Sequence, residues 1–203
     1  GVGGHEDKIL ERLKNERYKV LFSNAFGNDD INFDRIVKAL ASFTRSLVSL
    51  DSPFDQYAYQ MKDDVLSESQ LRGMNMFFSE KLECHHCHGG FNFTQSTTHE
   101  KQQLDLRAFH NTGLYNLAGE FSYPASDTGL FEATAKPQDV GRFRTPTLRN
   151  IALTAPYMHD GSIATLSEVV DFYAAGGRHI DSGSLAGDGR ENPYKSQFVK
   201  GFE

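Results

Sequence analysis

The sequence predicts an all-α protein in which helices carry long irregular loops. Apolar residues recur at helical spacing through the first half of the chain, and helix-capping pairs precede several of these stripes. The stretch 89–157 is instead rich in Gly, Asn, Thr and Ser and has no sustained period. Such loops cannot form a core alone, so we expect a bound group to complete it.

The first two helices are expected before residue 53. A charged amphipathic helix covers residues 6–22, and the Gly-Asn-Asp-Asp turn at 27–30 breaks the chain after it. Asn32 then caps a second helix with a long apolar stripe. Pro53 is expected to stop this helix, because proline has no N–H and cannot continue it.

Two capping boxes predict the remaining helices. Ser67 with Gln70 opens a helix that runs almost straight into the cysteine motif at 84–88. Thr165 with the glutamate three residues later opens another, which the following Gly-Gly pair ends. The buried face of this last helix is expected to hold the following residues: Leu166, Val169, Val170 and Tyr173.

Residues 84–88 read Cys-His-His-Cys-His, the C-x-x-C-H pattern that attaches a c-type haem. Cys84 and Cys87 lie about one helical turn apart, so both thiols can reach the vinyl groups of one porphyrin, and His88 follows as iron ligand. The motif predicts one covalent haem c and a cytochrome c-like domain. The alternatives are a disulfide between the two cysteines, or a zinc site using His85, His86 or His88 without the second ligand pair such sites need.

Composition narrows the location and the partners. The formal charge of −6 argues against a nucleic-acid partner and mildly favours a basic electron-transfer partner, although a solvated surface explains it equally. No apolar run approaches the length of a membrane span. Covalent haem attachment belongs to the oxidising side of the bacterial membrane, so we expect an exported, periplasmic protein whose signal peptide is not in this chain.

Four further segments are distinctive as short motifs. They are GRFRTPTLRN at 141–150, APYMHDG at 155–161, FHNTGL at 109–114 and SPFDQY at 52–57. Together with the haem motif they resemble the C-terminal haem domain of the bacterial di-haem cytochrome c peroxidase and MauG family, over residues 31–202. The chain departs from the family pattern in having no tryptophan, the residue that usually lies between the two haems.

The resemblance implies a domain organisation and a function. Residues 1–60 would be an N-terminal helical segment packing on the haem domain, and residues 61–203 that domain without its closing helix. The haem would relay electrons to a peroxide-reactive haem in an N-terminal domain absent from this chain. Hydrogen peroxide and a small electron-donor protein or protein substrate would be partners of the parent peroxidase-type oxidoreductase; the fragment alone is expected not to be catalytic. The alternative is a stand-alone mono-haem cytochrome c carrier without enzymatic activity.

Two residues compete for the distal position on the iron. Met158 is a soft thioether in a Pro-led loop, well placed in sequence after His88. In the family, however, the distal ligand follows the histidine of the Pro-Tyr-x-His segment by fourteen residues, which leads from His159 to Tyr173. Peroxidases of the family carry Met there and MauG carries Tyr. We favour Tyr173, while Met158 and an open or differently ligated site remain alternatives.

The motifs at 141–150 and 155–161 supply candidate haem contacts. Arg142, Arg144 and Arg149 could pair with haem propionates, because a guanidinium holds a carboxylate through two hydrogen bonds. The resemblance also places Pro146 and His159 near the haem, and an ordinary loop histidine is the alternative for His159.

Two pairs of residues complete the expectations. His85 and His86 fill the variable positions of the haem motif and are expected to be spectators there. The resemblance implies a calcium ion at an interdomain site that uses the carbonyls of Thr154 and Pro156. Half of that site would come from the absent domain, so calcium in this chain stays open.

Overall fold

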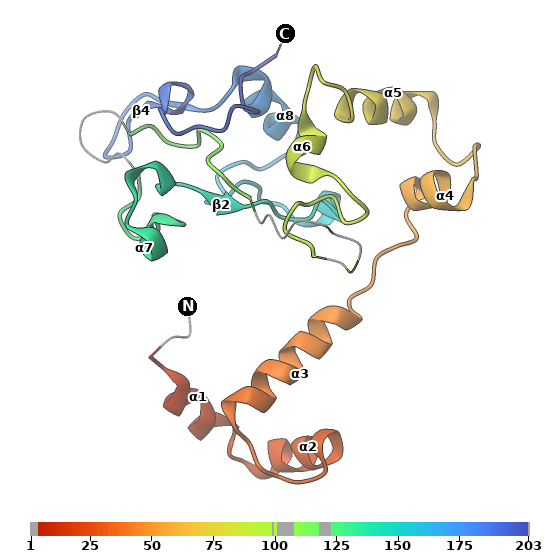
Figure 1. Ribbon diagram of the computed structural model, residues 1–203, viewed down its shortest axis with the longest axis vertical. Coiled ribbons are helices and arrows are strands. Elements are labelled where there is room, and N and C mark those ends of the chain that lie inside the picture. Colours follow the sequence, from red (N-terminus) through yellow and green to blue (C-terminus); the bar gives the residue numbers. More distant parts are fainter. Residues whose placement is uncertain (1–3, 99, 101–107, 118–122, 203) are drawn as a thin grey trace. The chain divides into compact units, whose positions relative to one another are not determined.

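The computed structural model describes the chain except for residues 1–3, 99, 101–107, 118–122 and 203. The chain forms two compact units, Gly1–Leu50 and Asp51–Glu203 (Figure 1). The second unit therefore begins ten residues before the predicted boundary at residue 61. Each unit is described by itself below.

The first unit consists of three helices, α1 (Glu6–Leu13), α2 (Glu16–Phe26) and α3 (Phe33–Ser46). The single helix predicted over residues 6–22 is wrong, because the chain breaks between α1 and α2. Asn15 is the cause: its side chain accepts a hydrogen bond from the backbone N–H of Tyr18 and starts a new helix. The small core of this unit consists of three buried side chains, Phe22, Ile31 and Ile36. Six partly buried hydrophobic residues pack against them: Ile9, Leu10, Leu13, Tyr18, Phe26 and Phe33.

Asn32 caps α3 as predicted, since its side chain accepts a hydrogen bond from the Arg35 N–H at 3.0 Å. The helix ends at Ser46, before the Asp51-Ser52-Pro53 segment as predicted, but Pro53 is not what stops it. Pro53 is the first residue of α4 (Pro53–Gln60). Proline suits that position, where its missing N–H would have no helical partner.

The second unit holds four further helices and two short strand pairs. The helices are α5 (Glu68–Phe77), α6 (Cys84–His88), α7 (Phe131–Thr134) and α8 (Leu166–Ala175). Strand β1 (Phe109–His110) pairs antiparallel with β2 (Phe143–Arg144), and β3 (His179–Ile180) pairs likewise with β4 (Gly187–Asp188). The helical character was predicted and the strand pairs were not. Among the described residues no helix has the length and apolarity needed to cross a membrane.

Both predicted capping boxes are present, at Ser67 for α5 and at Thr165 for α8. Helix α5 ends at Phe77, earlier than expected, so a short connection separates it from α6. On α8 the expected buried face is shifted. Val170 is 57% exposed, whereas Phe172, which the sequence analysis left out of that face, is buried.

The second unit has a small apolar core, and buried hydrogen bonds to the backbone lie beside it. The core consists of five buried residues: Leu114, Tyr115, Tyr123, Val140 and Phe172. Asn111, 1% exposed, donates from its side chain to the Val140 carbonyl and accepts from the Gly113 N–H, both at 2.9 Å. A Cβ on Gly189 would lie 2.0 Å from the Gly113 oxygen, so glycine is required where these two backbones meet.

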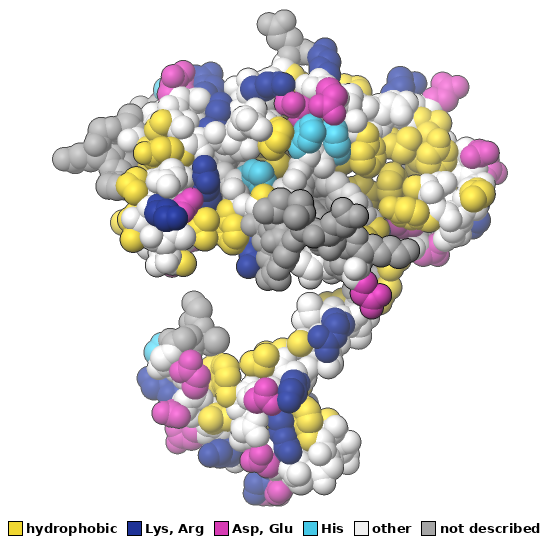
Figure 2. Space-filling view, in the orientation of Figure 1, with side chains coloured by type: hydrophobic (Ala, Val, Ile, Leu, Met, Phe, Trp, Pro, Cys, Tyr) yellow, Lys and Arg dark blue, Asp and Glu magenta, His cyan; other side chains and the backbone are white. Residues whose placement is uncertain are grey.

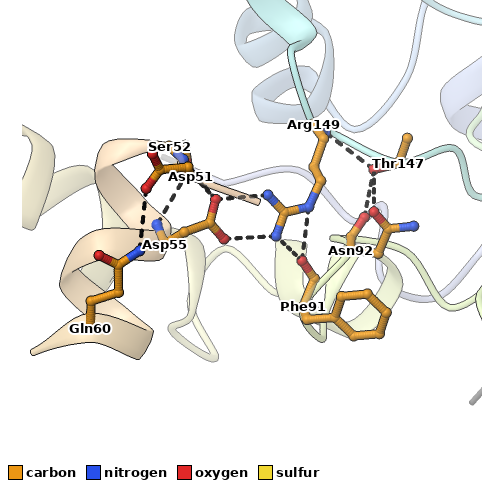
Figure 3. A network of polar contacts seen from close by, with 8 residues as sticks. All are labelled: Asp51, Ser52, Asp55, Gln60, Phe91, Asn92, Thr147 and Arg149. Carbon is orange, nitrogen blue, oxygen red and sulfur yellow. Dashed lines mark hydrogen bonds and ion pairs between the residues drawn. The ribbon is translucent and has the colours of Figure 1, made fainter. Parts of the chain in front are cut away.

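An ion pair joins α4 to the loops around α6 (Figure 3). The Arg149 guanidinium donates to both carboxylate oxygens of Asp55, at 2.8 and 2.9 Å, and also to the Phe91 carbonyl. The two side chains are only 8% and 3% exposed. Asp55 additionally accepts from the Ser52 N–H at 2.9 Å, so one carboxylate both caps α4 and anchors the arginine. This ion pair fixes the SPFDQY motif against the GRFRTPTLRN motif.

Asp55→Asn should lower the free energy of unfolding by about 3 kcal/mol, because it leaves a buried guanidinium without its counter-charge. Chemical denaturation measures this. Arg72→Gln, which removes one partner of an exposed pair with Glu68 on α5, is the control and should change stability little. An equal loss in both variants would contradict the role given to the buried pair.

The pH dependence of the same variant gives a second readout. Arg149 holds the pKa of Asp55 well below its ordinary value of about 3.9. The stabilisation is therefore fully present above that value and is lost as the pH falls through the folded-state pKa. The stability difference between wild type and Asp55→Asn should shrink progressively below about pH 4.

Candidate haem site

Helix α6 presents the two cysteines of the motif as free thiols, each only partly exposed. Burial raises the pKa of Cys84, and burial together with the neighbouring Cys84 raises the pKa of Cys87 to about 11. Both groups are consequently thiols at neutral pH. Their helical spacing is that expected for two attachment points on one porphyrin edge.

His88 is oriented by backbone carbonyls. Its Nδ1 lies 3.2 Å from the Phe93 oxygen, which can only accept, so Nδ1 carries the proton and Nε2 keeps the lone pair. Burial lowers the pKa of His88, and the carbonyls of Phe93 and Pro146 partly oppose this. The neutral imidazole with a free Nε2 lone pair is the form that coordinates iron. Pro146 thus reaches the site through its backbone.

The carboxyl end of α6 is held by a chain of hydrogen bonds that the sequence did not reveal. The backbone N–H of Gln95 donates to the Cys87 carbonyl at 3.1 Å, and its side-chain amide donates to the His86 carbonyl. Its side-chain oxygen lies 2.9 Å from His110 Nε2, and His110 Nδ1 lies 3.3 Å from the Ser196 hydroxyl. Gln95 and Ser196 carried no signal, whereas His110 belongs to the FHNTGL motif.

The loop after α6 is also tied to the GRFRTPTLRN segment. The hydroxyls of Thr94 and Ser96 both donate to the Thr145 carbonyl, at 2.6 and 3.0 Å. Thr145 is itself buried. Pro146 directly follows Thr145. These bonds therefore help to hold the Pro146 carbonyl beside the His88 ring.

Tyr173 lies on α8 (Leu166–Ala175). Its ring packs edge-on against Phe172, with centroids 5.2 Å apart. Burial raises the pKa of Tyr173, and the charges that Cys87 and Cys84 would carry raise it further, which means that the phenol lies within electrostatic reach of both thiols. Met158 packs against the same core cluster, in a backbone conformation with φ of 67°.

These donors fit a haem c. Two thiols one turn apart and a neutral imidazole with a defined tautomer are presented together by α6. They would hold the porphyrin edge and its iron. A disulfide is not formed between Cys84 and Cys87.

Comparisons with known proteins relate the chain to cytochrome c peroxidases and MauG. A sequence model described as di-haem cytochrome c peroxidase matches residues 1–64. The chain is 38% identical over 193 residues to cytochrome-c peroxidase IdrP1 of Pseudomonas sp. strain SCT, covering 87% of this chain and 50% of that protein. It is 36% identical over 171 residues to the methylamine utilization protein MauG of Methylophilus methylotrophus, covering 81% and 44%.

A solved structure is similar over nearly the whole chain. It is the crystal structure of a MauG-like protein associated with microbial copper homeostasis, 44% identical, with a TM-score of 0.83. The match covers 97% of this chain and 57% of that one. The chain belongs to the di-haem cytochrome c peroxidase and MauG family. It spans about half the length of the curated di-haem relatives it matches.

The arginines predicted to pair with haem propionates have different surroundings. Arg149 has every guanidinium nitrogen engaged by Asp55 or Phe91, which gives it a structural role in place of the predicted propionate contact. Arg142 forms an ion pair with Asp139 at 3.3 Å. Arg144 is exposed. Its contact with a haem propionate stays a prediction.

His159 lies on the surface, with Nε2 2.6 Å from an Asp127 carboxylate oxygen. The next residue, Asp160, accepts from the Tyr115 hydroxyl at 2.7 Å and forms an ion pair with Arg178 at 3.1 Å. The APYMHDG motif therefore supplies an acceptor for the hydroxyl of the buried Tyr115 and a surface partner for Asp127. The role of His159 beside a haem stays a prediction.

Proposed function

We propose that this chain is the electron-transfer part of a di-haem peroxidase or MauG-like oxidoreductase and binds one haem c. The observation that carries the proposal is the arrangement of Cys84, Cys87 and His88 on α6, with the His88 tautomer fixed by the Phe93 carbonyl. Family membership supports a haem-based oxidoreductase. A periplasmic location is part of the same proposal, and calcium at Thr154 and Pro156 stays open.

The residues would divide the work as follows. Cys84 and Cys87 would form thioethers, and His88 would coordinate through Nε2. Gln95 and His110 would keep the carboxyl end of α6 fixed, so that the imidazole does not turn. The bound haem would supply one-electron chemistry, which this chain's own side chains lack.

Changing both Cys84 and Cys87 to Ala should abolish covalent haem, since no thioether can then form. Haem staining of a denaturing gel, with a pyridine haemochrome assay, measures it. His85→Asn serves as the matched control within the motif and should keep the stain, because it alters only a variable position. Persistent staining of the double variant would sink the proposal.

We further propose that Tyr173 is the distal ligand. Its nearness to both cysteines supports this, whereas Met158 is placed only within the common core cluster. Deprotonation of Tyr173 needs a cation beside its oxygen, since burial alone keeps the phenol neutral. A phenolate is a hard anionic donor that favours ferric iron, so this haem would have a lower potential than a His/Met haem.

Tyr173→Phe should change the ferric absorption spectrum and raise the reduction potential of the haem-loaded protein. Met158→Leu should leave both nearly unaltered. Spectroelectrochemical titration of the two variants and the wild type compares them directly. The opposite pattern, with a Met–iron band lost only in Met158→Leu, would identify Met158 as the ligand.

The first unit supports the proposal that another domain of the parent protein completes this one. Within that unit Leu40, Phe43 and Leu47 lie along α3 and are 61%, 63% and 66% exposed. Apolar stripes of this kind mark interaction surfaces. The family match at residues 1–64 covers this unit and the first residues of the second unit, and the relatives are about twice as long as the region aligned with this chain.

The native protein should therefore carry two haems per chain, one of them in a domain outside these residues. Intact mass spectrometry combined with a haem assay on the source preparation gives both numbers. A native mass equal to this chain with a single haem would favour the stand-alone electron carrier instead.

A further inference from the structure

Three metal-ligating side chains converge on the outer side of the haem-attachment helix. Glu80, His85 and His86 each offer one ligand atom, and these atoms all lie within 4.8 Å of one another. Glu80 Oε1 is 3.5 Å from His85 Nε2, and Oε2 is 3.1 Å from His86 Nε2. Figure 2 shows histidine side chains gathered beside acidic ones over α6. Within the described residues no other group of three such side chains is assembled this closely.

The convergence is not what helix geometry alone would produce. Consecutive residues of a helix point about 100° apart, so neighbouring side chains normally diverge. Here the rings of His85 and His86 lie with centroids 4.3 Å apart. Phe198 stacks on His86 at 4.7 Å, and Phe78 contacts His85 at 6.1 Å between centroids. These aromatic rings support both imidazoles from behind and hold their positions.

The contacts within the chain leave His85 incompletely satisfied. Its Nδ1 is buried and is the one such side-chain atom, within the described structure, that has no hydrogen-bond partner. The atom that faces Glu80 is Nε2, so an ion held beside Glu80 would use Nε2 and not the unpartnered Nδ1.

Charge at the cluster favours a cation. A hydrogen bond from His86 lowers the pKa of Glu80, which keeps the carboxylate ionised at neutral pH. The Lys200 ammonium pairs with Glu83 at 2.7 Å, and its charge also acts on Glu80. Glu80 faces the two imidazoles with one carboxylate oxygen toward each.

We propose that Glu80, His85 and His86 form a binding site for a divalent transition-metal ion, separate from the haem. Two imidazoles and one carboxylate suit Zn²⁺ and Cu²⁺, and three protein ligands leave a position for water. Ligands held about 2.0–2.1 Å from a tetrahedral ion lie roughly 3.3–3.5 Å apart. The observed 3.1 and 3.5 Å separations are close to this spacing before any metal is bound.

The test is calorimetric titration of ZnCl₂ into the haem-loaded full chain after treatment with a chelator. Haem attachment occupies both cysteines, so thiols do not compete for the metal. One Zn²⁺ should bind per chain, and Glu80→Gln and His86→Asn should each weaken binding at least about tenfold. Electron paramagnetic resonance of bound Cu²⁺ should show nitrogen couplings from imidazole that are reduced in His86→Asn.

His179→Asn is the matched control, because His179 also lies near two carboxylates, Asp181 and Asp188, at 3.2 and 3.5 Å. Its Zn²⁺ affinity should equal that of the wild type. Absence of binding, or equal binding by wild type and Glu80→Gln, would overturn the proposal. If the chain carries no haem, the titration is made on the variant with both cysteines changed to Ala, so the metal site is tested independently of the haem proposal.

Discussion

The second unit depends on the buried ion pair between Asp55 and Arg149. The two residues are 94 positions apart in sequence, and their bidentate contact joins the start of α4 to the segment that supports His88. Burying two charges is costly, and a well-packed apolar pair of similar volume could be as stable. An apolar pair would not direct hydrogen bonds to Phe91 and Ser52, however, so the charged pair fixes one arrangement of three segments.

Around this ion pair the unit is held by hydrogen-bonded loops more than by a large apolar core. Among the described residues the largest fully buried side chains are those of Val140 and Asn111, and one of the two is polar. At Gly113 and Gly189 the two backbones pack directly against each other, with no side chains between them. A bound cofactor would add apolar surface to such a framework.

The sequence predicted those features that depend on local chemistry. Capping at Asn32, Ser67 and Thr165 was found where expected, because each cap is made within four residues. The break at Asn15 was missed, since a cap inside a periodic stripe competes with the stripe and the period alone does not show which prevails. Pro53 was misread because a proline can end one helix or begin the next.

The candidate site was predictable to a similar degree. Adjacent residues carry the C-x-x-C-H motif, so spacing alone revealed it, and the family's offset pointed to Tyr173. Gln95 and Ser196 were invisible because their roles arise from contacts across many residues, 86 in the case of His110 and Ser196. The role of Arg149 was likewise decided by Asp55, a partner that no local pattern could identify.

The link from α6 through Gln95 and His110 to Ser196 has a consequence for the order of folding. Ser196 is 86 residues beyond His110, so the last of these hydrogen bonds can form only after the whole intervening stretch has been synthesised. Before then only the contacts of Gln95, a residue close to α6 in the sequence, support the carboxyl end of that helix.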